Sequence, residues 1–231
     1  MWLLPVCWNL RPLYLPLFDR LLFRHPFEGG SARRYEHDER PAFGDLDDRL
    51  VDKLALTGRE RLLDLGCGPG TFSRCAALRH PALTVIAVDP SRDFARFDLS
   101  GPGPEPFHQE GRVCLVRAAG EALPLVDRSI DVAICLSSIR HVRDRARTFR
   151  ELRRVVTGKL LIVELDPEAS TERTHAHADQ LPPLLRAAFG PLVLRTAPPA
   201  AAISAIAVDA GFVQTALDPD PIQPVYLLEL R

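Results

Sequence analysis

Residues 61–166 contain five short apolar runs, and these runs limit the fold classes that the chain can adopt. The runs are RLLDL (61–65), LTVIAVD (83–89), RVCLVRA (112–118), SIDVAICLS (129–137) and KLLIVELD (159–166). They are apolar throughout, not only at alternate positions, which is typical of parallel strands buried on both faces. Because helical patterns lie between them, the sequence predicts an α/β fold with helices on both faces of the sheet.

Three stretches carry the apolar spacing of a helix with one buried face. They contain Phe72, Cys75 and Ala76; Ala146, Phe149, Leu152 and Val155; and Phe43, Leu46, Leu50, Val51 and Leu54. The first is expected to stop at His80-Pro81, because proline cannot continue a helix. The arginines of residues 143–156 then occupy the solvated sides of the second.

The C-terminal residues follow a different pattern. A helical piece near 200–210 ends at Gly211, a residue that favours a helix stop. The apolar segments FVQTALD (212–218) and PVYLLELR (224–231) follow without a helix between them, so we expect antiparallel neighbours. The predicted sheet therefore has seven strands, mostly parallel, and finishes with an antiparallel pair.

The N-terminal residues differ from the rest, so we expect a flap or lid over 1–42 and one domain over 43–231. Residues 1–18, MWLLPVCWNLRPLYLPLF, are apolar but broken by prolines, and fit neither a signal peptide nor a membrane span. A peripheral flap, a homodimer contact or contact with a membrane surface remain as interpretations, and a cytoplasmic protein is expected. Residues 27–41 have no apolar period and predict a mobile loop.

Charge and metal-ligand spacing favour neither a nucleic-acid partner nor a metal. The 29 basic and 30 acidic residues give a net charge of −1, so bulk attraction to nucleic acid is absent. The five cysteines form no CxxC pair and fit small buried residues in a reducing compartment. His175, His177 and Asp179 form a lone HxHxD, interpreted as a solvated helix start.

Three glycines follow the first predicted strand in RLLDLGCGPGTFSR (61–74), where a helix is expected to begin. Three residues without side chains at a strand-to-helix turn suggest that a ligand lies against the main chain. A dinucleotide fingerprint needs a third glycine where Thr71 stands, and a phosphate-binding Walker loop needs a lysine that is not there. Pro69 also removes an amide donor, so both phosphate interpretations are weakened.

Asp89 ends the second predicted strand, nineteen residues after Gly70. A carboxylate at that place reaches the hydroxyls of a ribose bound across the strand ends. A ligand with a ribose and no phosphate fits S-adenosylmethionine, and NAD stays open as the alternative.

Several motifs in order resemble the class I S-adenosylmethionine-dependent methyltransferases. They are DLGCGPG (64–70), VDPS (88–91), GEALPLVDRSIDVAICLSSIRHV (120–142) and AGF (210–212). The resemblance covers roughly residues 43 to 231 and is to the small-molecule enzymes of the UbiE/MenG-like group, methyltransferase type 11. It implies a Rossmann-like sheet and S-adenosylmethionine as cofactor, with S-adenosylhomocysteine as product.

The resemblance also implies site residues. Those expected to bind the cofactor are Tyr35, Asp64, Gly66, Cys67, Gly68, Gly70, Asp89, Pro90, Ala119, Gly120, Glu121, Cys135 and Leu136. The glycines and Asp64 would hold the methionine end, Asp89 the ribose hydroxyls, and residues 119–121 the adenine. Many family members have aspartate where this chain has Ala119, so adenine recognition would fall on backbone groups.

Two residues after the fourth predicted strand are candidates on the acceptor side. His141 is the candidate general base, against the alternative of a histidine packed on the next helix. Arg140 is the candidate for binding an acidic group of the substrate, against a surface arginine. The expected function is methyl transfer to a small molecule; the alternatives are a member that binds the cofactor without methylating, and an NAD-dependent oxidoreductase.

Overall fold

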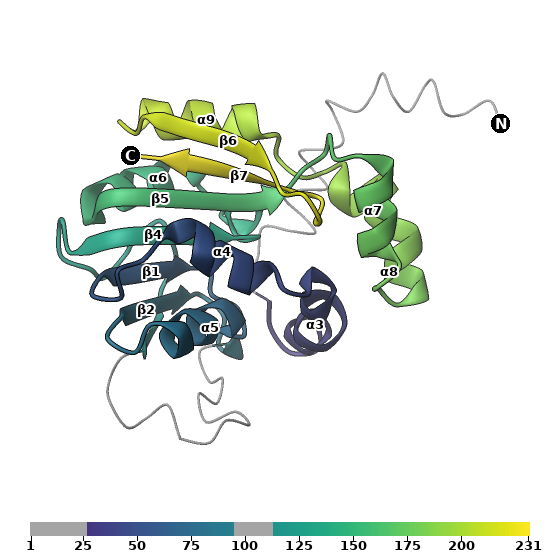
Figure 1. Cartoon of the computed structure of the whole chain (residues 1–231), viewed down its shortest axis with the longest axis horizontal. Helices are drawn as coiled ribbons and strands as arrows, with labels where there is room; N and C mark the ends of the chain where they lie inside the picture. The colour runs from purple at the N-terminus through teal and green to yellow at the C-terminus, as the bar shows by residue number, and fades with distance from the viewer. Residues whose placement is uncertain (1–26, 95–112) are drawn as a thin grey trace.

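The computed structural model of the chain describes residues 27–94 and 113–231, so the apolar N-terminal segment lies outside the described residues. Within them, seven strands form one sheet in the order β3-β2-β1-β4-β5-β7-β6 (Figure 1). The strands are β1 Arg61–Leu65, β2 Thr84–Asp89, β3 Val113–Arg117, β4 Ile130–Leu136, β5 Val156–Leu165, β6 Gln214–Pro219 and β7 Val225–Leu230.

The strand directions confirm the predicted fold class. β1 pairs in parallel with β2 and β4, β2 with β3, and β4 with β5, whereas β7 is antiparallel to β5 and β6. The strand order reverses between β1 and β4, because the chain runs from β1 to β2 on one side and reaches β4 on the other. In open sheets of this kind, ligands bind beyond the carboxyl ends of the strands at that reversal.

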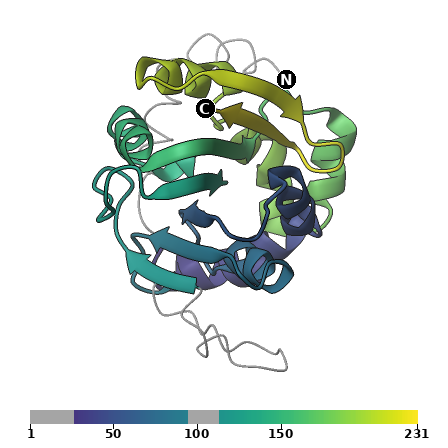
Figure 2. The ribbon, with the colours of Figure 1, turned by 60° about the vertical axis from the view of Figure 1, so that its left-hand side comes forward.

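Helices cover both faces of the sheet (Figure 2). α4 (Leu46–Leu54) and α5 (Thr71–Arg79) pack on one face, and α6 (Arg145–Val155) and α9 (Ala200–Asp209) pack on the other. Successive strand residues serve opposite cores, since Leu62 packs with the first pair of helices and Leu63 with the second. The central strands β1, β4 and β5 are therefore mostly buried, which explains their apolar runs. β3 and β6, at the two edges of the sheet, are more exposed. Cys114 of β3 is exposed, so the prediction of a buried residue is wrong for this cysteine.

One residue of the predicted buried face of α6 is placed differently. Phe149, Leu152 and Val155 are buried as predicted, but Ala146 is exposed and Thr148 is buried instead. Thr148 faces Gly120, where an added Cβ would lie 2.9 Å from the threonine methyl. The chain between β3 and β4 therefore packs on Thr148, and Ala146 lies on an exposed side of α6.

The prediction of a mobile loop at 27–41 is wrong. α3 (Gly30–Arg34), the π-helix η2 (Tyr35–Glu39) and the 3-10 helix η3 (Arg40–Phe43) wind through it. The sequence shows no apolar period here because polar as well as apolar contacts hold the segment. Ala32 is buried, and buried Arg40 forms an ion pair with Asp47 of α4. A lid role for residues 1–42 stays a prediction.

Three short helices stand beyond the carboxyl ends of the parallel strands: α7 (Thr171–Ala178), α8 (Pro183–Ala188) and the π-helix η7 (Phe189–Leu194) (Figure 1). The HxHxD motif lies at the end of α7, not at a helix start as predicted. His175 is exposed, but His177 is buried between the rings of Phe43 and Phe189, at centroid distances of 5.0 and 4.6 Å. The prediction of a solvated His177 is therefore wrong, because Phe43 and Phe189 pack against this end of α7.

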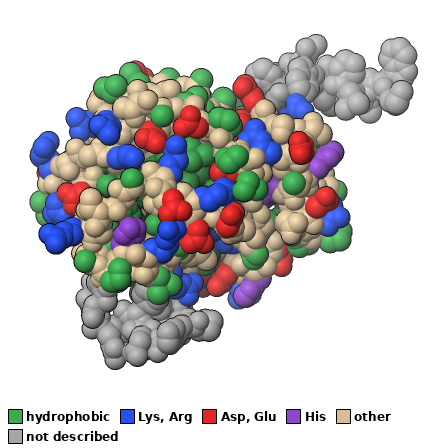
Figure 3. Space-filling view, in the orientation of Figure 1, with side chains coloured by type: hydrophobic (Ala, Val, Ile, Leu, Met, Phe, Trp, Pro, Cys, Tyr) green, Lys and Arg blue, Asp and Glu red, His purple; other side chains and the backbone are tan. Residues whose placement is uncertain are grey.

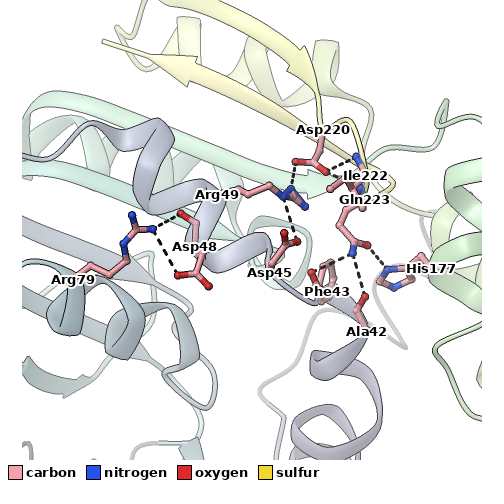
Figure 4. A network of polar contacts seen from close by, with 10 residues as sticks. All are labelled: Ala42, Phe43, Asp45, Asp48, Arg49, Arg79, His177, Asp220, Ile222 and Gln223. Carbon is pink, nitrogen blue, oxygen red and sulfur yellow. Dashed lines mark hydrogen bonds and ion pairs between the residues drawn. The ribbon is translucent and has the colours of Figure 1, made fainter.

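The turn between β6 and β7 ties α7 to the N-terminal helices (Figure 4). Gln223 Oε1 lies 2.7 Å from His177 Nδ1, and its amide nitrogen donates to the carbonyls of Ala42 at 3.3 Å and Phe43 at 3.1 Å. Asp220 of the same turn accepts a hydrogen bond from Arg49 of α4 at 2.9 Å. These contacts fix α7 and η3 relative to the sheet.

On the face drawn in Figure 3, basic and acidic side chains are interspersed. Over residues 27–94 and 113–231, no helix combines the length and apolar character that crossing a membrane requires. Nor do these residues bring three histidine, cysteine or acidic side chains together in a way that could hold a metal ion.

Candidate functional site

The glycine run forms the turn from β1 into α5. Its φ angles are 75° at Gly66, 53° at Gly68 and 74° at Gly70, in the region that L side chains rarely adopt. Gly66 packs against Ser138 in the loop after β4. At Gly68 an added Cβ would meet only the rings of Tyr35 and Phe94, at 3.6 and 3.9 Å. The second glycine therefore presents bare backbone toward these rings.

Asp89 ends β2 directly beside this turn. One carboxylate oxygen accepts the Gly68 N–H at 3.0 Å, and the other accepts the Ser91 N–H at 2.8 Å. The side chain is mostly buried, and burial raises the pKa of Asp89, while these two hydrogen bonds lower it. Since an ionised carboxylate offers about four acceptor positions, about two remain for a ligand.

A cavity of about 510 Å³ opens at the carboxyl ends of β1, β2 and β4. Most of the predicted site residues line it: Tyr35, Gly66, Gly68, Asp89, Pro90, Ala119, Gly120, Glu121, Leu136 and His141. The volume lies within the range of small-molecule and cofactor sites, roughly 300–1,000 Å³. The structure thus brings together residues from six separate parts of the chain around one cavity.

The remaining residues predicted to bind the cofactor lie outside the cavity lining. Asp64 is buried beneath the turn, where it accepts the Ser73 hydroxyl at 2.6 Å, and burial raises its pKa to about 7. Gly70 begins α5. The thiols of Cys67 and Cys135 are buried, and burial raises the pKa of both. A thiol in that state is a poor nucleophile.

Residues 119–121 form the wall next to α6. Glu121 lines the cavity, but one of its oxygens accepts the N–H of Asp144 at 2.9 Å, just before α6 begins. Ala119 lines it without offering a polar side chain, as the sequence indicates. The polar groups available on this side are therefore backbone groups, the second oxygen of Glu121, and the residues Arg143, Asp144 and Arg147, which also line the cavity.

Aromatic rings from the N-terminal segment close the cavity on another side. The Phe27 ring lies 5.3 Å from Tyr35, 6.4 Å from Phe94 and 5.0 Å from His141, between centroids. The Ser91 hydroxyl donates to the Phe27 carbonyl and anchors this segment to the loop after β2. Burial raises the pKa of the Tyr35 phenol to about 12, so the hydroxyl stays protonated.

A second cavity of about 170 Å³ adjoins the first, with Phe27, Tyr35, Ser137 and His141 lining both. Its far wall is apolar and comes from η3, β5, α8, η7 and the chain between α7 and α8; this wall consists of Phe43, Leu165, Leu181, Leu185, Phe189 and Val193. The chain after β4 and the stretch from α7 to η7 both contribute residues to this cavity.

Arg140 lines the second cavity and is buried, so the alternative of a surface arginine is wrong. Its guanidinium donates to the Val193 carbonyl at 3.2 Å and to the Thr196 hydroxyl at 3.0 Å. Its backbone N–H donates to Glu164 at 3.3 Å, and burial raises the pKa of that carboxyl.

Several lining residues were not among the predicted site residues. Phe27, Phe94, Arg143 and Arg147 line the first cavity and stand outside every motif used for prediction. Ser137 and Ser138 also line it; they lie within the motif of residues 120–142 but were not named as site residues. Glu164, in the second cavity, did leave a signal, because it is the acid inside the apolar run KLLIVELD. A charged residue near the carboxyl end of a buried parallel strand faces the ligand-binding edge of the sheet.

Comparison with known proteins points to one family. Residues 63–162 match the family model described as a methyltransferase domain. The ubiquinone/menaquinone biosynthesis C-methyltransferase UbiE of Syntrophotalea carbinolica is 34% identical over 155 residues, which are 64% of this chain and 60% of that protein. The 27-O-demethylrifamycin SV methyltransferase of Amycolatopsis mediterranei is 32% identical over 112 residues, 48% of this chain and 40% of that protein.

The fold is likewise that of solved methyltransferases. A SAM-dependent methyltransferase from Aquifex aeolicus superposes with a TM-score of 0.66 at 15% identity, over 86% of this chain and 95% of that one. The shared fold thus covers nearly the whole of the Aquifex aeolicus structure. The chain matches 60% of the length of the first curated relative and 40% of the length of the second.

Proposed function

The chain is a member of the class I methyltransferases, in the group that includes the UbiE proteins, and on this premise we propose that it methylates a small-molecule acceptor. S-adenosylmethionine supplies a methyl group activated by a positive sulfonium and leaves as S-adenosylhomocysteine. The chain's own part is to hold this group, align the acceptor with it and exclude water.

The observation that carries the proposal is the arrangement of Asp89 beside Gly68. Two backbone N–H groups fix the carboxylate at the end of β2 and leave about two acceptor positions for a pair of ribose hydroxyls. Gly68 leaves room beside it for the rest of the cofactor. The residues present therefore fit S-adenosylmethionine, with residues 119–121 beside the adenine and Leu65, Gly66 and Leu136 beside the methionine end.

The arrangement favours this cofactor over a nicotinamide dinucleotide. A pyrophosphate needs the free N–H groups at the start of the helix after the turn. Among the described residues that line the first cavity, Gly68 is the last before α5, and neither Gly70 nor Thr71 is included. The start of α5, where a pyrophosphate would bind in a dinucleotide fold, is therefore not part of the cavity lining.

On the acceptor side, His141 is the proposed general base, because its ring lies in the wall common to both cavities. Tyr35 is proposed to cover the cofactor from the same wall. Arg140 keeps its proposed contact with the acceptor, although its guanidinium already donates to Val193 and Thr196. The acceptor is proposed to be a small molecule, because the names of the two curated relatives refer to small molecules.

Calorimetric titration with S-adenosylmethionine and S-adenosylhomocysteine tests the proposal. Both are expected to bind the parent, and Asp89→Asn is expected to weaken each at least tenfold, because a charged acceptor contributes roughly 1.5–3 kcal/mol per hydrogen bond. Asp131→Asn, at an exposed ion pair with Arg61, is the matched control and should bind like the parent. No binding by the folded parent would refute the cofactor assignment.

Cofactor binding alone does not exclude one alternative, a member that binds the cofactor without methylating an acceptor. Turnover of S-adenosylmethionine to S-adenosylhomocysteine in the presence of candidate acceptors separates the two. An acceptor-dependent rate that falls in His141→Ala, with S-adenosylhomocysteine affinity unchanged, supports the methyltransferase and the role of His141.

A further inference from the structure

The HxHxD motif contains one buried side chain to which the proposed function gives no role, His177 at the end of α7. Its ring is stacked on the Phe189 ring at an interplanar angle of 29° and tilted by 63° against the Phe43 ring. Only 4% of the residue is exposed, and it lines the second cavity. What a neutral histidine offers to a cavity depends on which ring nitrogen carries the proton.

The Gln223 side chain decides which nitrogen this is, because its own orientation is fixed (Figure 4). Its amide nitrogen donates to the carbonyls of Ala42 and Phe43 at 3.3 and 3.1 Å. A reversed amide would set its oxygen against these two carbonyl oxygens, and no hydrogen bond could form. The amide oxygen therefore faces His177, and the Gln223 backbone N–H donates to Asp220 at 2.6 Å and holds the residue in place.

The contact between Gln223 and His177 selects one tautomer. An amide oxygen can only accept, so the His177 Nδ1 must be the donor across the 2.7 Å between the two atoms. The Nε2–H tautomer would place two lone pairs against each other at this distance. Burial lowers the pKa of His177, which disfavours the imidazolium. The ring is therefore neutral, with its proton on Nδ1 and a lone pair on Nε2.

The Nε2 atom of His177 is open to the second cavity. Over residues 27–94 and 113–231, no hydrogen bond reaches this nitrogen, and it is not one of the side-chain atoms that are both enclosed and unpaired. It therefore has contact with open space, and the second cavity is the space that His177 lines. Since Phe43 and Phe189 on either side belong to the apolar wall, Nε2 is an acceptor set among apolar side chains.

We propose that Gln223 is a positioning residue that holds His177 in the Nδ1–H tautomer, so that Nε2 is a fixed hydrogen-bond acceptor for a ligand of the second cavity. The ligand group that fits it is an O–H or N–H donor. Because the ring cannot exchange tautomers, a ligand that lacks the donor leaves Nε2 unpaired and binds less tightly. A methyl acceptor with such a donor would be oriented by Nε2, and this link to methyl transfer rests on the proposed function.

Nitrogen-15 NMR of the histidine side chains tests the tautomer directly. At neutral pH, the parent should show a protonated Nδ1 and an unprotonated Nε2 at His177. Gln223→Met keeps the length of the side chain without its polar atoms and should release the ring into a mixture of both tautomers. Gln180→Met, at an exposed position after α7, is the matched control and should leave the His177 signals unchanged. A protonated Nε2 in the parent would overturn the inference.

Two probes of nearly equal size, pyrrole and furan, test the acceptor. Pyrrole carries an N–H donor where furan has an oxygen. Titrations followed by saturation-transfer NMR should show pyrrole binding about threefold to tenfold more tightly than furan, the effect of one net hydrogen bond. His177→Phe, which keeps an aromatic ring between Phe43 and Phe189, should remove this preference. A parent without preference for pyrrole, or a preference that persists in His177→Phe, would contradict the proposal.

Two neighbouring residues of α8 offer a matched pair for locating the probes. Leu185 lines the second cavity, whereas Leu184 is 83% exposed. Leu185→Trp should weaken pyrrole at least tenfold, and Leu184→Trp should bind pyrrole like the parent. Pyrrole that binds equally in both variants lies outside the second cavity, and the site proposed for it is then wrong. Circular dichroism of every variant against the parent checks that it folds.

These measurements need no cofactor, so their outcome is separate from that of the proposed function. If the folded parent fails to bind S-adenosylhomocysteine but shows the expected tautomer and probe preference, the proposed function falls and the site at His177 stands. If S-adenosylhomocysteine binds but Nε2 is protonated, the site at His177 falls and the methyltransferase assignment stands.

Discussion

Gly66 and Ser138 are in such close contact that a Cβ at position 66 would lie 2.3 Å from the Ser138 Cβ. Ser138 cannot easily withdraw, because its hydroxyl donates to the Leu65 carbonyl at 2.6 Å. The first glycine of the run is therefore required by the protein's own packing between β1 and the loop after β4. Only the second, Gly68, combines a positive φ with a Cβ position that meets nothing but side-chain rings.

Alanine substitutions at these two glycines are expected to have different effects. Gly66→Ala combines a left-handed backbone with a severe overlap, so it should lower the free energy of unfolding by about 3 kcal/mol. Gly68→Ala should cost only about 1 kcal/mol, from the backbone alone, but should weaken S-adenosylhomocysteine at least tenfold. Urea unfolding and calorimetry measure both; equal losses of stability would contradict the distinction.

Asp64 is expected to make stability depend on pH. Burial raises its pKa from 3.8 to about 7, so the folded protein keeps the proton over a range in which the unfolded chain has lost it. The free energy of unfolding therefore falls as the pH rises from about 4 to about 7, and this contribution is level above. Asp64→Asn can still accept the Ser73 hydroxyl and should remove that fall.

The measurement is urea unfolding of parent and Asp64→Asn at pH 5 and pH 8. The variant should gain stability relative to the parent between the two values. Asp131→Asn serves as control, since the Arg61 hydrogen bond lowers the pKa of Asp131 and its effect appears only at acid pH. A gap between parent and Asp64→Asn that does not change with pH would count against the buried, protonated carboxyl.

The Tyr35 ring is expected to slow the release of the product. It packs against the rings of Phe27 and Phe94 at centroid distances of 5.3 and 6.1 Å and borders both cavities. Aromatic contacts of this kind contribute about 1 kcal/mol, so Tyr35→Ala should speed dissociation of S-adenosylhomocysteine about fivefold. Tyr35→Phe keeps the ring and should stay within twofold; stopped-flow displacement decides between packing and the hydroxyl.

Gln223 is expected to support the fold without contributing to cofactor binding. Gln223→Ala would leave the carbonyls of Ala42 and Phe43 and the His177 ring buried without this partner. We expect a loss of about 2–3 kcal/mol in the free energy of unfolding, with S-adenosylhomocysteine affinity unchanged. Gln180→Ala, at an exposed position after α7, is the control and should cost less than about 0.5 kcal/mol.

The sheet could be predicted in detail because its signal is local. Each strand buried on both faces leaves an unbroken apolar run, and the antiparallel pair follows from the lack of a helix between β6 and β7. The wall nearest the glycine turn could also be predicted, since Gly68, Asp89 and Gly120 stand in short motifs at the ends of strands.

The second cavity could not be predicted, because contacts between distant segments create it. Phe43, Glu164 and Phe189 come from three elements that the sequence separates by more than a hundred residues in total. The helical winding of residues 30–43 was missed for the same reason. Arg40 is buried there and paired with Asp47, and an ion pair of this kind leaves no apolar period in the sequence.

The two cavities draw on the chain in unequal ways. Leu181, Leu185, Phe189 and Val193, which border only the second, come from one continuous stretch between β5 and α9. The first is assembled around the strand ends at the centre of the sheet. Exchanging that stretch, in evolution or by design, would therefore change the lining of the second cavity. The residues around the first cavity, where the methyl donor is proposed to bind, would stay as they are.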